Sequence, residues 1–134
     1  MILYGCLMSI KDWKEYLKFE KDKYKKLKCT KCPAIGYNEV HFNHYGFDHI
    51  VYKNGIPRPR YEVVNRFMFL SHVPKALKTK NSANKEEKRD EGIFSKHAYF
   101  WTIRFSVNRH LHLRIILRKL GDNGRIHFFS VMDE

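Results

Sequence analysis

Apolar side chains recur at helical spacing between residues 10 and 28, with lysines and acidic residues on the other faces. Ser9, followed by Asp12, gives a capping-box start, because a serine side chain can accept a hydrogen bond from the first helical turn. The CTKCP stretch then ends the segment, since proline cannot continue a helix. The pattern predicts an amphipathic helix with a stripe of Ile10, Trp13, Leu17, Tyr24 and Leu27.

A short strand and a second helix are predicted next. EVHF, at 39–42, has the alternation of a strand. Asn43 then offers a side-chain cap for a helix over 44–53, which stops at an Asn-Gly pair, a common C-terminal signal. The histidine-rich stretch HFNHYGFDHI therefore lies across a junction between a strand and a helix.

Prolines in the middle of the chain mark a linker and the starts of two helical segments. IPRPR, at 56–60, is typical of a stiff basic linker, and Pro59 can open a helix over 60–70. Pro74 begins one further helical turn, PKALK. Residues 78–92 carry dense charge and no large apolar side chain, which predicts a mobile surface loop.

Three runs of aromatic and β-branched residues follow, at 97–105, 110–120 and 125–132, and they predict strands. A Gly-Asp-Asn-Gly turn joins the last two as a hairpin. Helices followed by an antiparallel sheet make an α+β fold. In the middle strand, strand alternation separates a core face from a cationic face. The core face holds Leu111, Leu113, Ile115 and Leu117, and the cationic face holds His110, His112, Arg114 and Arg118.

Composition changes this picture by pointing to a polyanionic partner. The 134 residues suit a single domain over 1–134, and 26 lysines and arginines against 14 acids give a net charge of +12. Nucleic acid is the expected partner, because a strongly positive protein attracts polyanions. A membrane is the rival partner, but the apolar MILYGCLM stretch is too short to cross one. Three cysteines, an odd number, fit a reducing compartment, so we expect a cytoplasmic protein.

Two cysteines and two histidines have spacings that metal sites use. Cys29 and Cys32 form a CxxC pair, and His41 and His44 could complete four zinc ligands. The spacer between the pairs is shorter than in the usual zinc finger, which favours two reduced cysteines at a helix end and no cofactor. A structural zinc remains the alternative.

His49 lies opposite the apolar stripe of the 44–53 helix, with Tyr45 and Tyr52 about one turn away. An imidazole beside a basic surface can act as a general acid or base, because its pKa lies near neutral pH. A solvated histidine on an exposed helix face is the alternative interpretation.

Arginines and aromatic residues make up the remaining candidates, and they favour a groove that binds phosphates and stacks bases. Ser130 is a polar interruption in the last apolar strand. There is no phosphate-binding glycine loop, no Ser-His-Asp spacing and no acidic cluster for magnesium. These features favour ribonuclease chemistry in which the 2′-hydroxyl of RNA is the nucleophile. The groove candidates are Arg58, Arg60, Arg66, Tyr99, Trp101, Arg104, Arg114 and Arg118.

The stretches VHFNHYGFDHIVYK, RPRYEVVNRFMFL, SHVPKAL, YFWTIRF and LRIILRKLGDNGRIHFFSVM make residues 32–132 resemble a known family. That family is the phage-associated branch of the barnase, EndoU, colicin and RelE-like (BECR) nucleases. The resemblance implies N-terminal helices packed on a curved antiparallel sheet of about four strands, with metal-independent RNA cleavage on its open face. The CxxC pair and the charged loop depart from the shared pattern.

The resemblance also implies site residues, which map here to His49, Arg60 or Arg66, Arg118 and Ser130. We expect His49 to be the general base or acid, Arg66 and Arg118 to bind the scissile phosphate, and Ser130 to orient it. The expected setting is a toxin or phage-derived effector that acts on RNA. One alternative is a non-catalytic nucleic-acid-binding module that holds zinc. Another is a component that docks on an acidic partner such as an antitoxin or immunity protein.

Overall fold

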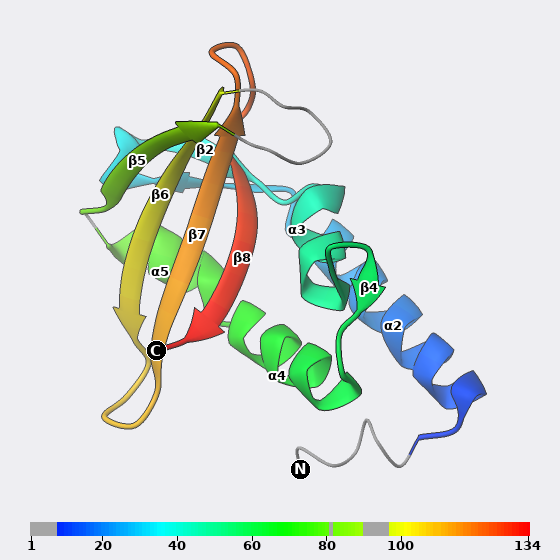
Figure 1. The fold of residues 1–134 in the computed structure, drawn as a ribbon. Coiled ribbons are helices and arrows are strands. Elements are labelled where there is room, and N and C mark those ends of the chain that lie inside the picture. Colours follow the sequence, from blue (N-terminus) through cyan, green and yellow to red (C-terminus); the bar gives the residue numbers. More distant parts are fainter. Residues whose placement is uncertain (1–7, 81, 90–96) are drawn as a thin grey trace.

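The computed structural model describes residues 8–80, 82–89 and 97–134. Its helices all precede the long strands, and they lie behind and beside one curved sheet (Figure 1). The α-helices are α2 (Ile10–Lys25), α3 (His44–Val51), α4 (Arg60–Leu70) and α5 (Val73–Thr79), with a 3-10 turn at Pro33–Ile35. The strands are β1 (Cys29–Cys32), β2 (Asn38–His41), β3 (Tyr52–Lys53), β4 (Ile56–Pro57), β5 (Asn84–Arg89), β6 (His97–Ser106), β7 (His112–Leu120) and β8 (His127–Asp133).

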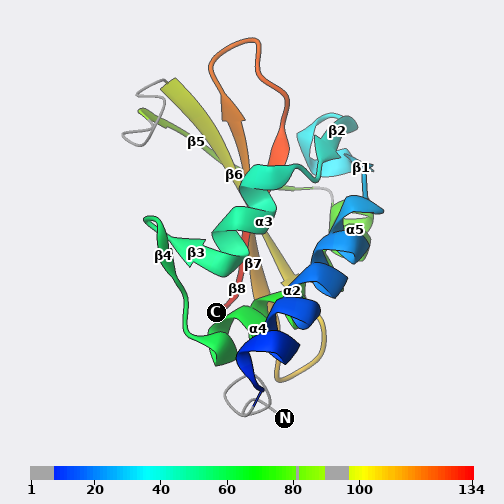
Figure 2. The same ribbon diagram turned by 90° about the vertical axis from the view of Figure 1, so that its right-hand side faces the viewer.

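The main sheet has six strands in the order β1-β2-β8-β7-β6-β5. Its neighbours pair antiparallel except β2 and β8, which run parallel and meet at His41 and His127. Strands β3 and β4 form a separate two-stranded ribbon. Beyond its meeting with β2, the outer side of β8 faces helices α3 and α4 (Figure 2).

The α+β class is confirmed, but the expected sheet of about four antiparallel strands is wrong, because the sheet is mixed and has six. Two additional strands arise where sequence patterns favoured other structures. CTKC, expected as a helix end, forms β1, and β5 lies inside the expected loop at 78–92. An outer strand pairs on one side only and tolerates charged side chains. The low hydrophobicity of these two segments therefore did not exclude a strand in either. Residues 81 and 90–92 of that expected loop lie outside the described residues.

Strand β7 carries the centre of the core, as its alternation predicted. Leu113, Ile115 and Leu117 are fully buried. They pack with side chains from both neighbouring strands and from α4 and α5, among them Ile103, Phe128, Val131, Val63, Phe67 and Leu77. The helices thus cover one face of the sheet and leave the other to carry polar side chains.

Both predicted N-terminal caps are confirmed. The Ser9 side chain accepts a hydrogen bond from the Asp12 amide at 3.1 Å, and the Asn43 side chain accepts one from the Tyr45 amide at 3.2 Å. Helix α2 ends at Lys25, earlier than the predicted residue 28, because Lys28 adopts a positive φ of 54° before β1 begins. The Tyr24 hydroxyl donates to the Asn43 carbonyl at 2.6 Å, which fixes α2 against the start of α3.

Candidate functional site

Helix α3 approaches β8 closely because it carries glycine at the contact. A Cβ placed on Gly46 would lie 2.5 Å from both the Phe128 carbonyl oxygen and the Tyr24 hydroxyl, a distance that side chains do not adopt. One helical turn further on, the His49 ring lies 4.3 Å from the ring of Phe129. The small residue therefore brings an imidazole against the last strand.

A bulge in β8 sets the direction of its side chains. Leu117 pairs with Phe128 and Ile116 pairs with Ser130, so Phe129 is an extra residue in the ladder. Such bulges redirect side chains and often occur next to active sites. Here the Phe129 ring contacts both His49 and the Arg118 guanidinium, whose central carbon lies 4.1 Å from the ring centroid.

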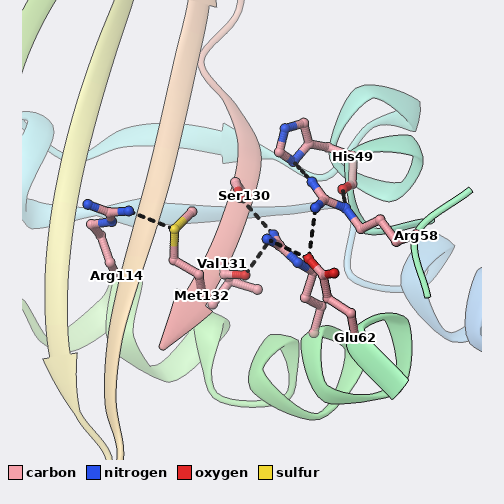
Figure 3. Close-up of polar contacts among 8 residues, drawn as sticks. His49, Arg58, Glu62, Arg114, Ser130, Val131 and Met132 are labelled. Carbon is pink, nitrogen blue, oxygen red and sulfur yellow. Dashed lines mark hydrogen bonds and ion pairs between the residues drawn. The ribbon is translucent and has the colours of Figure 1, made fainter. Parts of the chain in front are cut away.

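Arg58, just before α4, is buried and holds His49 through two contacts (Figure 3). Its Nε donates to the His49 carbonyl oxygen at 2.9 Å, and its Nη2 lies 3.4 Å from His49 Nδ1. A guanidinium can only donate, so His49 Nδ1 accepts in this contact. The same arginine donates from Nη1 to Glu62 Oε1 at 2.9 Å.

Glu62 joins Arg58 to Arg66 through one oxygen atom (Figure 3). Arg66 Nη2 lies 3.4 Å from Glu62 Oε1, and its Nη1 donates to Ser130 Oγ and to the Val131 carbonyl, both at 3.2 Å. The spacing of four residues places Glu62 and Arg66 on one side of α4, and Arg58 reaches Glu62 from just before the helix. Arg66 is thereby fixed against β8.

Arg118 and His127 face each other across β7 and β8. Arg118 Nε donates to His127 Nε2 at 3.1 Å, so that nitrogen is unprotonated. The Arg118 guanidinium also lies over the Tyr45 ring, 5.1 Å from its centroid. Arg118 and His127 are both buried.

His127, which is buried, and His49, which is half-buried, both have a pKa lowered to about 4. For His49 the largest cause is burial, followed by the positive charges of Arg58, Arg66 and Arg118. For His127 the causes are burial and then Arg118. At neutral pH the imidazoles are neutral, and the pocket's charge comes from three guanidiniums against the Glu62 carboxylate.

The structure brings together the four residues that were expected to be catalytic: His49, Arg66, Arg118 and Ser130. Ser130 is only 2% exposed and accepts a hydrogen bond from Arg66, so it positions this arginine and cannot itself orient a phosphate. The sequence interpretation missed Glu62, His127, Phe129 and Tyr45. Helical spacing could have revealed Glu62, whereas the others depend on the β8 bulge and on how α3 docks.

Three of the expected groove arginines lie outside this cluster. Arg60 donates to the Met8 carbonyl at 2.7 Å and lies over the Trp13 ring, at the start of α2. Arg104 pairs with Glu134, and Arg114 donates to Met132 Sδ at 2.8 Å (Figure 3). Arg58 lies inside the cluster, but it was expected to bind nucleic acid and instead holds His49 from a buried position.

The expectation of one groove combining arginines with Tyr99 and Trp101 is wrong. Tyr99 pairs with Lys119 and Trp101 with Leu117, on the face that contains the core. Arg118 pairs with Phe100, and successive side chains of a strand point to opposite faces. The two aromatic residues therefore lie across the sheet from the arginine cluster.

The four candidate zinc ligands do not converge. Cys32 is fully buried, whereas the Cys29 thiol donates to Glu39 Oε2 at 2.8 Å, next to His41 on the neighbouring strand. His44 is exposed, with its ring 4.1 Å from that of Tyr45. Within residues 8–80, 82–89 and 97–134, no group of three or more histidines, cysteines or acids is arranged to hold a metal ion.

Comparisons with protein-family models, with curated proteins and with solved structures found no match to this chain. In the described part of the chain, no helix is long and apolar enough to cross a membrane. The geometry of the cluster is therefore the observation that bears on function.

Proposed function

We propose that the protein is a metal-independent endoribonuclease that cleaves RNA by attack of the 2′-hydroxyl. One observation carries the proposal: Arg58, Arg66 and Arg118 surround His49, with Glu62 as the carboxylate between two of them. Gathering like charges in a sparsely solvated pocket costs free energy, and a bound anion offsets that cost. Perturbed ionisable groups of this kind cluster at functional sites.

Arg66 and Arg118 are the proposed ligands of the scissile phosphate, because guanidiniums match its oxygens with paired donors. Glu62 forms an ion pair with Arg66 in the free protein, and the phosphate replaces Glu62 as the partner of Arg66 when RNA binds. Arg58 holds the backbone and ring of His49 and so acts as a positioning residue. The positive pocket repels Mg²⁺, which supports chemistry without a divalent cation.

His49 is the proposed general base, since burial and the arginines keep its imidazole neutral and able to accept a proton. Nδ1 is the unprotonated nitrogen of the neutral ring, and once Arg58 Nη2 leaves it, Nδ1 takes the proton of the 2′-hydroxyl as the 2′-oxygen attacks phosphorus. The bond from phosphorus to the 5′-oxygen breaks, and that oxygen takes a proton from the imidazolium or from water. The products are a 2′,3′-cyclic phosphate and a 5′-hydroxyl. The negative charge of the phosphate favours the imidazolium during the reaction.

Single substitutions test these roles. In an RNA cleavage assay with EDTA present, we expect His49→Ala to lower the rate about 10²–10⁴-fold, the usual effect of losing a general base. Arg66→Ala should lower it about 10²–10³-fold through lost charge stabilisation. Arg109→Ala, an exposed arginine in the β6–β7 turn, is the matched control and should cleave as wild type does. Equal rates for His49→Ala and the control would remove His49 from the mechanism.

The proposed family is the BECR nucleases, and the proposed setting is a toxin or phage-derived effector, held in check by an acidic antitoxin or immunity protein. The net charge of +12 supports such a partner as well as RNA. A non-catalytic zinc-binding module is the competing proposal. Near-stoichiometric zinc in purified protein, together with intact RNA in the cleavage assay, would favour that module.

A further inference from the structure

A second cationic and aromatic surface lies on the other face of the sheet from the arginine cluster. Lys85 Nζ lies 4.9 Å from the Tyr99 ring centroid and 5.6 Å from that of Trp101. Lys119 Nζ lies 5.4 Å from the Tyr99 centroid. Tyr99 and Trp101 are half-buried, so part of each ring remains accessible. Aromatic rings with nearby ammonium groups are the elements that stack bases and hold the phosphates between them.

Lys119 also lines a groove of about 350 Å³ between β2 and the β7–β8 turn, with His41 and Arg125. This volume is at the lower end of small-molecule sites, about 300–1,000 Å³, and suits one nucleotide. Glu39 is the carboxylate in the groove, and it accepts a hydrogen bond from the Cys29 thiol. Lys119 and Arg125 therefore leave the groove with a positive balance.

The groove lies next to the arginine cluster. His41, in its lining, is the strand partner of His127, and His127 accepts the hydrogen bond from Arg118. His41 and His127 thus lie on adjacent strands, about one strand spacing of 4.8 Å apart, at the edge where the groove meets β8. A strand of RNA can thus pass from one site to the other along the end of β8.

We infer that Tyr99, Lys119 and Arg125 form a binding site for the unpaired RNA strand beside the cleavage point, which rests on the proposed ribonuclease function. Tyr99 stacks a base, with Trp101 beside it, and Lys119 and Arg125 contact phosphates. An unpaired strand is the ligand because its bases can turn outward and stack on side chains, whereas those of a duplex cannot. The site would make the protein select single-stranded regions.

Binding can be measured apart from cleavage with a fluorescein-labelled single-stranded 2′-O-methyl RNA, which has no attacking hydroxyl. By fluorescence anisotropy, we expect Tyr99→Ala to weaken binding about tenfold, the order of one lost base stack. Tyr99→Phe keeps the ring and should bind as wild type does. Lys119→Gln and Arg125→Gln should each make the dependence of log K on log salt shallower by about 0.7. Thermal melts check that each variant is folded.

The outcomes separate this site from the cleavage site. All these variants should cut a dinucleotide at the wild-type rate, because its only phosphate is the one that is cleaved and it has no further nucleotide to place on Tyr99. Wild-type affinity in Tyr99→Ala, equal weakening in Tyr99→Phe, or equal binding of duplex RNA would overturn the binding site while leaving the cleavage proposal intact. A wild-type protein that binds the single-stranded RNA but does not cleave RNA would overturn the ribonuclease proposal and keep the binding site.

Discussion

His49 is held between a ring and a guanidinium that come from different parts of the chain. Phe129 packs on one side, and Arg58 contacts both the backbone and Nδ1. Burial and positive neighbours lower its pKa to about 4, so the free protein presents a neutral imidazole. Because positive neighbours lower the pKa of His49, any change of charge in the pocket should change that pKa.

The charge of Arg66 can be removed to test this sensitivity. In Arg66→Gln we expect the pKa of His49 to rise, because one of the charges that lower it is lost. It should stay below 6.5, since burial is the larger cause. Proton NMR titration of the imidazole resonances measures both values. A wild-type pKa at or above 6.5 would contradict the proposed environment.

Added phosphate or a mononucleotide supplies the opposite change in the same titration. Anion binding should raise the pKa of His49, since negative charge favours the imidazolium. Arg104→Gln, far along the sheet in an ion pair with Glu134, is the control that should leave the titration unchanged.

At the residue scale, the sequence predicted His49 better than its surroundings. Helical periodicity alone separated His49 from the apolar stripe of α3, because the period fixes faces before the fold is known. The contact between Phe129 and His49 could not be predicted in this way. The extra residue in β8 interrupts the alternation of side chains between the two faces of the sheet, on which strand prediction depends. Arg58 was assigned to nucleic acid, but its burial beside His49 depends on tertiary packing.

At the element scale, the docking of α3 on β8 depends on Gly46. We expect Gly46→Ala to destabilise the protein by about 1–3 kcal/mol, the usual cost of overpacking. It should also lower RNA cleavage, because the shift of α3 moves His49 away from Phe129. Urea unfolding and the cleavage assay measure the two effects. Asp48→Ala, exposed on the same helix, is the control.

Unchanged stability in Gly46→Ala would mean that α3 does not need this close approach. Unchanged cleavage with reduced stability would separate the docking of α3 from the catalytic role of His49.

The long elements were predictable from sequence, and the short outer strands were not. The apolar alternation of β7 and the caps of α2 and α3 are local signals, and each is confirmed. β1 and β5 have few large apolar residues and are defined by pairing with β2 and β6. Backbone pairing with a distant segment leaves little trace in local composition, so the sheet has more strands than expected.

For the whole molecule, His49 and His127 predict a stability that falls in acid. Their pKa is about 4 in the folded protein and 6.5 as the ordinary value, so the unfolded chain binds more protons between these limits. The stabilisation is complete above pH 6.5 and is lost as the pH falls towards 4. The loss approaches about 3 kcal/mol for each histidine, at 1.36 kcal/mol per unit of pKa. Urea unfolding at both limits measures it.

His127→Gln gives the matched control, because an amide oxygen can still accept from Arg118 Nε but does not titrate in this range. The variant should lose less stability between pH 6.5 and 4 than the wild type does. The comparison also cancels Glu20, whose pKa burial raises. The same slope in both proteins would show that His127 does not titrate as proposed.

The chemical ends of the products distinguish attack by the 2′-hydroxyl from other routes of cleavage. An RNA strand is incubated with the protein in EDTA, beside a strand of the same sequence whose ribose is 2′-O-methylated throughout, and the products are identified by mass spectrometry. Attack by the 2′-hydroxyl predicts fragments that end in a 2′,3′-cyclic phosphate and begin with a 5′-hydroxyl, and no cleavage of the methylated strand. RNA that stays intact, or fragments with 3′-hydroxyl and 5′-phosphate ends, would contradict cleavage by 2′-hydroxyl attack.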